Sequence, residues 1–175
     1  MANIIEAEKN FNALVEGFEP MIRNIMAVQK KEVQIYITEQ LYSGINGNDK
    51  PLRPTYLNDP YFKSHESGKW YKNARGYMMW KNMERPPYAS SWLGTPRRSP
   101  ETPNLIIRGD FYNSITAVPF DKGLRIGSVG ISFSDDIERK YGQAIYRVGS
   151  YARRYFIEKY VKKGIEDYFR KFGVE

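Results

Sequence analysis

The chain has 175 residues, no cysteine, one histidine, and 27 lysines and arginines against 20 acidic residues, which gives a net charge of +7. Without cysteine it cannot form disulfides, thiolate metal sites or a cysteine nucleophile, and with His65 alone it cannot form a multi-histidine metal centre. No apolar run approaches the about 20 residues that span a bilayer, and the first residues lack the pattern of a signal peptide. We therefore expect one soluble domain with no membrane partner.

Apolar residues recur at steps of three and four along residues 3–18, which predicts an amphipathic helix. Gly17 and Pro20 interrupt this pattern, and Pro20 suits the first turn of a second helix, because its missing N–H has no helical partner to lose there. The second helix should end near Tyr42. We expect residues 1–42 to form a helical hairpin.

The second helix carries two apolar rows. One broad row predicts the side that faces the core, and a narrower row has members seven residues apart. Such a row is typical of a seam against a neighbouring helix, which either the first helix of the same chain or a second subunit could supply. The seam comprises Met21, Val28, Ile35 and Tyr42.

Between Ser43 and Asp110 the chain holds eight of its ten prolines and all three tryptophans. We expect residues 43–103 to be a mostly irregular, extended arm with one short helix near residues 67–83. Large aromatic side chains are costly to expose in a loop, so they should dock on the sheet, on a partner subunit or on both. The aromatic residues expected at a subunit interface are Tyr56, Tyr61, Trp70, Trp80 and Trp92.

A small antiparallel sheet is predicted in the next segment, residues 104–149. Its β-prone runs are typical of short strands, and the last two should form a hairpin that residues 131 and 133 could extend. The expected strands are residues 104–108, 114–118 and 123–129, with the hairpin turn at Asp121-Lys122-Gly123.

A short helix should follow the hairpin, capped by Ser134 and closed by Gly142. Its first turn holds three acidic residues, Asp135, Asp136 and Glu138. Paired carboxylates could serve as an acid/base site or a metal site, but favourable charge at a helix N-terminus explains this cluster more simply.

The last helix should span residues 150–172, with one apolar face and one charged face. On the charged face, oppositely charged residues lie four apart at Glu158/Lys162, Glu166/Arg170 and Asp167/Lys171.

The segment around the last helix is the most basic part of the chain. Its basic side chains form either a solvated helix face or a surface that faces DNA or an acidic partner. They are Arg147, Arg153, Arg154, Lys159, Lys162 and Lys163.

The chain contains no phosphate-binding glycine loop, no nucleophile elbow and no spaced metal-ligand signature. We therefore expect no catalytic residues, no cofactor and no metal. The expected fold is α+β, with long N-terminal and C-terminal helices packed on a small antiparallel sheet. Helices with more than one apolar face and an aromatic arm are typical of an interaction or assembly protein.

Three blocks of sequence carry a resemblance in their order and spacing. They are Glu39-Gln-Leu-Tyr-Ser-Gly-Ile-Asn46 with Pro51-Leu-Arg-Pro-Thr-Tyr56, then Pro103-Asn-Leu-Ile-Ile-Arg-Gly-Asp-Phe-Tyr-Asn-Ser-Ile115, then Ile137-Glu-Arg-Lys-Tyr-Gly142 with Ile145-Tyr-Arg-Val148. In these blocks the chain resembles the small neck and tail-completion proteins (head-tail connectors) of tailed bacteriophages. The insertion around residues 64–100 and the basic C-terminal helix depart from that family's pattern.

The resemblance implies an α+β subunit of a closed ring, six-fold or twelve-fold, located in the neck or tail of the virion and assembled in the host cytoplasm. Its implied partners are further copies of itself, the portal or connector and tail proteins, and packaged DNA that passes through the ring without sequence readout.

Three hypotheses about function follow. The leading one is a structural ring subunit, not an enzyme, joined through the second helix and the arm. The alternative is a basic nucleic-acid-binding module that acts through the C-terminal helix. The third is a nuclease or cell-wall hydrolase that uses Asp135, Asp136 and Glu138.

Overall fold

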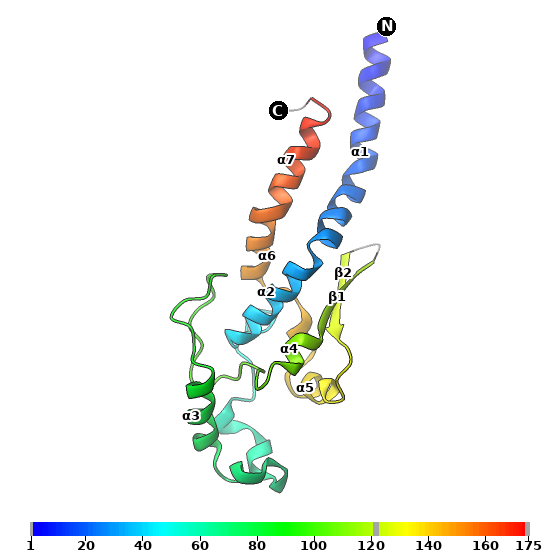
Figure 1. Ribbon diagram of the computed structural model, residues 1–175. Coiled ribbons are helices and arrows are strands. Elements are labelled where there is room, and N and C mark those ends of the chain that lie inside the picture. Colours follow the sequence, from blue (N-terminus) through cyan, green and yellow to red (C-terminus); the bar gives the residue numbers. More distant parts are fainter. Residues whose placement is uncertain (1, 121–122, 174–175) are drawn as a thin grey trace.

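A computed structural model describes residues 2–120 and 123–173 of the chain. It confirms the expected α+β class, with helices around one antiparallel hairpin. Figure 1 shows an elongated molecule in which two helical rods run side by side and the hairpin lies along one flank. The first turns of α1 and the last turns of α7 lie at one end of the molecule, and the segment that holds α3 lies at the other.

Helices α1 (Ala2–Val28) and α2 (Lys30–Tyr42) follow one another end to end, as Figure 1 shows. Helical hydrogen bonds continue across their joint, because the Gln29 N–H donates to the Ile25 carbonyl at 3.0 Å and the Val33 N–H donates to the Gln29 carbonyl at 3.2 Å. The two helices form one rod, and the hairpin predicted for this segment is wrong.

The two residues expected to reverse the chain lie inside α1. Pro20 is exposed, so water can take the place of the N–H that the Glu16 carbonyl loses. Gly17 lies beneath Tyr168, whose hydroxyl would collide with a Cβ atom at position 17. Gly17 therefore permits the close approach of another helix and does not mark a turn.

The C-terminal rod runs through α6 (Ser150–Phe156), a π-helical segment η5 (Ile157–Val161) and α7 (Lys162–Arg170). This agrees with the helix predicted over residues 150–172, apart from the π-helical turn. A π turn inserts an extra residue and shifts the faces of the helix. Ile157, an apolar residue of this rod, is exposed at this turn.

One of the three predicted ion pairs on this rod is present among the described residues. Lys162 contacts Glu158 at 2.6 Å, whereas Arg170 contacts Asp167 at 3.7 Å in place of Glu166. All four side chains are exposed, so these pairs contribute little to stability.

Helix α2 lies at the centre of the molecule because both buried clusters include its residues. Val33 and Tyr36 belong to one cluster, and Ile37 and Leu41 belong to the other, so the second helix does carry a broad apolar row that faces the core, as predicted. The first cluster is completed by Leu93, Ala152 and Phe156, and the second by Leu52, Phe111, Ile115 and Ile145.

The predicted hairpin is confirmed. Strand β1 (Ile115–Phe120) follows helix α4 (Asp110–Ser114) and pairs antiparallel with β2 (Gly123–Ser128), with residue 115 opposite residue 128. Two residues of the predicted turn, Asp121 and Lys122, lie outside the described residues. Ile131 and Phe133 do not extend the hairpin.

The strand predicted over residues 104–108 does not form. Leu105 has a φ of +53°, which takes the backbone out of the extended region, and Asn104 is fully buried. The Tyr112 hydroxyl donates to the Asn104 carbonyl, so a side chain takes the place of a neighbouring strand.

Helix α5 (Ser134–Tyr141) ends as predicted at Gly142, which has a φ of +77° and donates its N–H to the Glu138 carbonyl at 2.7 Å. Ser134 is the first helical residue, and its hydroxyl donates to the Ile131 carbonyl instead of capping the helix. The short 3-10 helix η4 (Gln143–Tyr146) follows.

The first part of the arm, residues 56–84, is folded and not extended, whereas residues 85–103 form no helix or strand, which agrees with the irregular segment expected there. The first part forms 3-10 turns η1 (Tyr56–Asn58), η2 (Pro60–Lys63) and η3 (His65–Trp70), followed by α3 (Ala74–Glu84), which matches the short helix expected in this region. The reason is aromatic packing: the Tyr77 ring lies between 4.9 and 5.5 Å from four other aromatic rings. These are Tyr56, Phe62, Trp70 and Trp80.

A buried glutamine joins α2 to the start of the C-terminal rod. The Gln40 side chain donates to the Arg147 carbonyl at 3.1 Å and accepts from the Gly149 N–H at 2.8 Å. Gln40 and Gly149 are both buried, so the Gly149 N–H cannot turn to water if the side chain is lost.

We expect Gln40→Leu to lower the free energy of unfolding by roughly 2–4 kcal/mol, because it leaves the buried Gly149 N–H without a partner and removes the hydrogen bond to the Arg147 carbonyl. Urea denaturation of the two proteins measures this difference. Gln143→Leu, at an exposed position, is the control and should change stability by less than about 0.5 kcal/mol. Equal effects of the two substitutions would contradict the role given to Gln40.

Candidate functional site: exposed helix faces and a buried lysine

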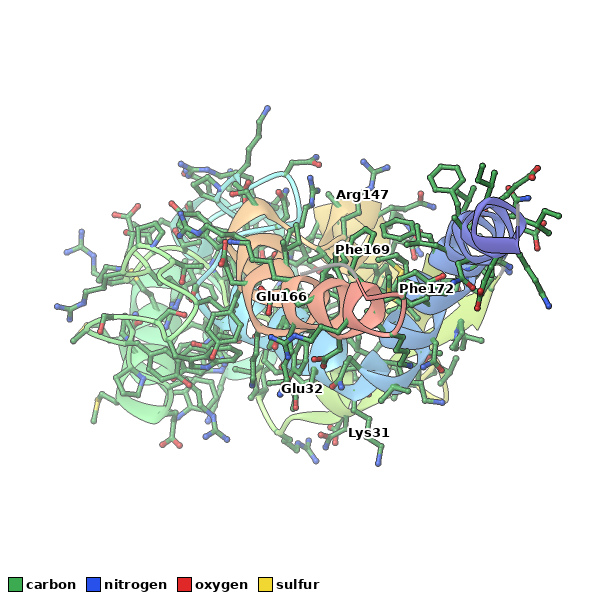
Figure 2. All side chains as sticks on the ribbon, turned by 90° about the horizontal axis from the view of Figure 1, so that it is seen from above. Lys31, Glu32, Arg147, Glu166, Phe169 and Phe172 are labelled. Carbon is green, nitrogen blue, oxygen red and sulfur yellow. The ribbon has the colours of Figure 1, made fainter. Side chains whose placement is uncertain are left out.

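Helices α1 and α7 pack against each other along part of their length. The Tyr168 hydroxyl donates to the Leu14 carbonyl at 2.8 Å, and the rings of Phe18 and Phe169 lie 6.4 Å apart. Figure 2 shows Phe169 on the side of α7 that faces α1, and Figure 1 shows α1 continuing beyond α7. About twelve residues of α1, roughly 18 Å of helix, therefore project past this contact.

A face of α1 that runs from the projecting part to Val15, just past the contact, carries apolar and acidic side chains. Ile4, Phe11 and Val15 are exposed, Phe11 by 65%, and Glu8 lies between the first two at steps of four and three. Residues 2–19 have a net charge of −3, against +10 for the rest of the chain. An uncovered apolar stripe on a helix is typical of a surface that another protein covers. We call Ile4, Glu8, Phe11 and Val15 the α1 stripe.

The seam predicted on the second helix is only partly covered within the chain. Met21 is half-buried, and the Tyr42 ring stacks on Tyr88 with ring centres 4.3 Å apart. Val28 and Ile35 remain exposed. Tyr42 is therefore covered within the chain, whereas the two middle members of the seam are not.

A lysine lies within the exposed part of the seam. Lys31 is exposed and falls between Val28 and Ile35 at steps of three and four, and Figure 2 shows it on the outside of the molecule. We call Val28, Lys31 and Ile35 the seam stripe. It has the same alternation of apolar and charged side chains as the α1 stripe, with the opposite sign of charge.

The five aromatic residues of the arm expected at an interface are placed differently from one another. Tyr56 is buried in the arm's own core, which corrects its assignment to an interface. Trp70 and Trp80 are half-buried against each other and Tyr77. Tyr61 is exposed, and Trp92 is 47% exposed beside Tyr36 and Tyr155.

All six basic residues predicted to contact DNA or an acidic partner are exposed, but they do not form one uniform surface. Figure 2 shows Arg147 and Glu32 on opposite sides of the C-terminal rod, and Lys159 lies 3.9 Å from that Glu32. Lys162 is paired with Glu158. The basic residues therefore surround the rod, and acidic residues neutralise part of their charge.

Arg147 and Arg153 line an open groove of about 830 Å³ between β2, α5 and the start of α6. Arg125 of β2 adds a third positive charge, and Asp135 and Glu138 add two negative charges. The groove has mixed charge, so it does not by itself favour a polyanion.

The remaining candidates for chemistry are dispersed. Asp136 is exposed and paired with Arg139 at 2.8 Å, and His65 stacks on Tyr71 with ring centres 4.0 Å apart. In the part of the chain that the structure describes, no group of three or more acidic or histidine side chains is placed to hold a metal ion. The described helices also include none with the length and apolarity needed to cross a membrane.

Helix α3 places one cation in the interior. Lys81 is 2% exposed, and its ammonium group has no hydrogen-bond partner among the described residues. Burial, and to a smaller extent the nearby charges of Arg98 and Arg85, lower the pKa of Lys81 from 10.5 to about 8.

The sequence contains a sign of this buried lysine. Lys81 falls on the apolar side of α3, four residues after Tyr77 and three after Met78. A lysine at such a position is either a long side chain that reaches solvent or a buried charge. Only the surroundings of α3 in the folded chain, which the sequence does not reveal, decide between these two.

Comparisons of the chain with family models, with curated proteins and with solved structures each found no significant match. Function therefore has to be inferred from the exposed stripes, the basic rod and the buried lysine.

We expect Lys81→Met to raise the free energy of unfolding by roughly 1–3 kcal/mol at pH 7, because it removes a buried charge without a counter-ion. The folded chain has the lower Lys81 pKa, so the cost is fully present below about pH 8 and is lost as the pH rises toward 10.5. Urea denaturation between pH 7 and 9.5 should show the gain shrinking.

Lys63→Met, at an exposed lysine, is the control and should have no such effect. A Lys81→Met protein that is less stable at pH 7, or whose gain does not change with pH, would contradict this account of Lys81.

Proposed function

We propose that this chain is a structural subunit that assembles with copies of itself into a ring. The observation that carries the proposal is the α1 stripe, an exposed apolar helix face, most of which lies on the about 18 Å of α1 that projects past the Tyr168–Leu14 contact. Covering that face in a complex recovers roughly 25 cal/mol for each Å² of apolar surface removed from water.

The neighbour's seam stripe is the partner that best fits the α1 stripe. Glu8 would meet Lys31, and the apolar side chains on either side of each charge would pack together. Both stripes are exposed and both run along helices, so a helix-on-helix contact can bury them together.

Charge favours a contact between different surfaces over a symmetric pairing of two α1 helices. Two α1 helices would bring two segments of charge −3 together, whereas α1 on the body of a neighbour joins segments of opposite charge. A contact between two different surfaces repeats from copy to copy and closes into a ring when the rotation allows it.

The location that we propose for this ring is the head-to-tail joint of a tailed bacteriophage, around the channel through which DNA passes. The three-block resemblance to neck and tail-completion proteins supports this location. Portal or connector proteins and tail proteins would then bind the two ends of the ring, and the DNA would pass without sequence readout.

Phe11→Ser should reduce assembly of the full chain by at least about tenfold in its apparent dissociation constant, because it removes a large apolar side chain from the contact. Native mass spectrometry and light scattering measure the size of the assembly. Met83→Ser is a matched control, since Met83 is 81% exposed and lies in α3, far from both stripes. A strictly monomeric unmodified chain, tested with and without portal or tail proteins, would overturn the proposal.

Charge reversal tests the pairing of the two stripes. Glu8→Lys and Lys31→Glu should each weaken assembly, and the chain with both substitutions should assemble more strongly than either single variant, because the opposite charges meet again. The same light-scattering assay at low salt measures this. Additive losses in the double variant would reject the pairing of Glu8 with Lys31 while leaving self-assembly intact.

Nucleic-acid binding through the C-terminal rod is the second candidate, and the exposure of all six basic residues favours it. It predicts that affinity for DNA falls steeply with salt and is lost when Arg153, Arg154, Lys162 and Lys163 are changed to glutamate. Fluorescence anisotropy with a DNA duplex measures both effects. If the chain binds the DNA duplex at low salt no more tightly than it binds a neutral polymer, this function is excluded.

A further inference from the structure

A small pocket lies at the junction between the arm and the body of the molecule. Its volume is about 260 Å³, below the roughly 300–1,000 Å³ of sites that take drug-sized ligands. Helix α3 contributes Lys81 to its wall, and residues 103–107, Phe133 and Ile137 contribute apolar side chains. The pocket is therefore of a size for a single side chain or a small molecule.

Three charged side chains line this pocket, and ion pairs account for two of them. Lys140 pairs with the buried Asp59, and Asp136 pairs with Arg139 at 2.8 Å. Lys81 differs from both, because its buried ammonium group has no hydrogen-bond or ion-pair partner within the described residues.

The negative charge that acts on Lys81 is that of Glu84 at the end of α3, but Glu84 is exposed and its effect is smaller than the burial and the nearby arginines that lower the pKa of Lys81. The nearby Arg98 is also buried and donates to two backbone carbonyls, which are neutral. The hydroxyls of Tyr56 and Tyr141, which line the pocket, keep their protons because burial raises the pKa of both. The pocket thus has an excess of positive charge at Lys81.

We propose that this pocket binds a carboxylate carried on a short apolar chain, with the carboxylate paired to Lys81 and the apolar chain against Ile107 and Phe133. A buried ammonium group without a counter-ion favours an anion. Apolar walls favour a ligand with a hydrocarbon part over inorganic phosphate or sulfate. A free short-chain acid and the C-terminal residue of a peptide share this chemistry, and neither requires that the ring forms.

Calorimetric titration of the full chain with hexanoate and with hexanamide tests the pocket. The two probes have the same apolar chain and differ in charge, so hexanoate should bind at least about tenfold more tightly. Lys81→Met should remove this difference, and the control Lys63→Met should retain it. Ile107 is 57% exposed at the pocket, so Ile107→Trp should fold and should weaken the binding of both probes by occupying the space.

Equal affinities of the two probes for the unmodified chain would overturn the proposal, as would a hexanoate preference that survives Lys81→Met. The Ile107→Trp variant keeps the test decisive if Lys81→Met does not fold. A second titration, with acetyl-Ile-Leu and its C-terminal amide, assigns the source of the carboxylate. A peptide acid that binds more tightly than hexanoate identifies a peptide C-terminus, and weaker binding identifies a free acid.

Discussion

The burial of α2 on two sides is the constraint on which the rest of the structure depends. Tyr36 and Ile37 are both inaccessible to solvent although they are adjacent in the chain. Adjacent helical positions point about 100° apart, so two separate sets of side chains must cover them. The C-terminal rod supplies one set and the hairpin region supplies the other. The arm contributes Leu52 and Leu93 to the two sets, so it is anchored on α2 as well.

Periodicity in the sequence was enough to predict the helices, because their apolar rows report directly on burial. The hairpin was also predictable, since alternation and a turn signal coincide at residues 114–129. The direction of the chain after Pro20 was not predictable. A glycine followed by a proline is typical of a turn, and only the presence of Tyr168 against Gly17 explains why the helix continues there. The strand predicted over residues 104–108 does not form for a related reason, because burial of Asn104 outweighs the preference of these residues for a strand.

The candidate site was predictable where it depends on single helices. The seam was visible from its seven-residue spacing, and two of its four members are exposed. The arm was harder to predict, because aromatic side chains that are too costly to expose can pack on each other as well as on a partner. Tyr56 and Tyr77 pack on each other. The buried position of Lys81 depends on contacts between segments far apart in sequence, which no local pattern reports.

The contact between Gly17 and Tyr168 lies near the end of the stretch over which α1 packs on α7, and a long segment of α1 extends beyond it. A rotation of the projecting 18 Å segment by about 10° about this contact would displace its far tip by about 3 Å. Small angular adjustments at one glycine would thus be amplified at the tip, and a single sequence could fit neighbours arranged on circles of slightly different radius.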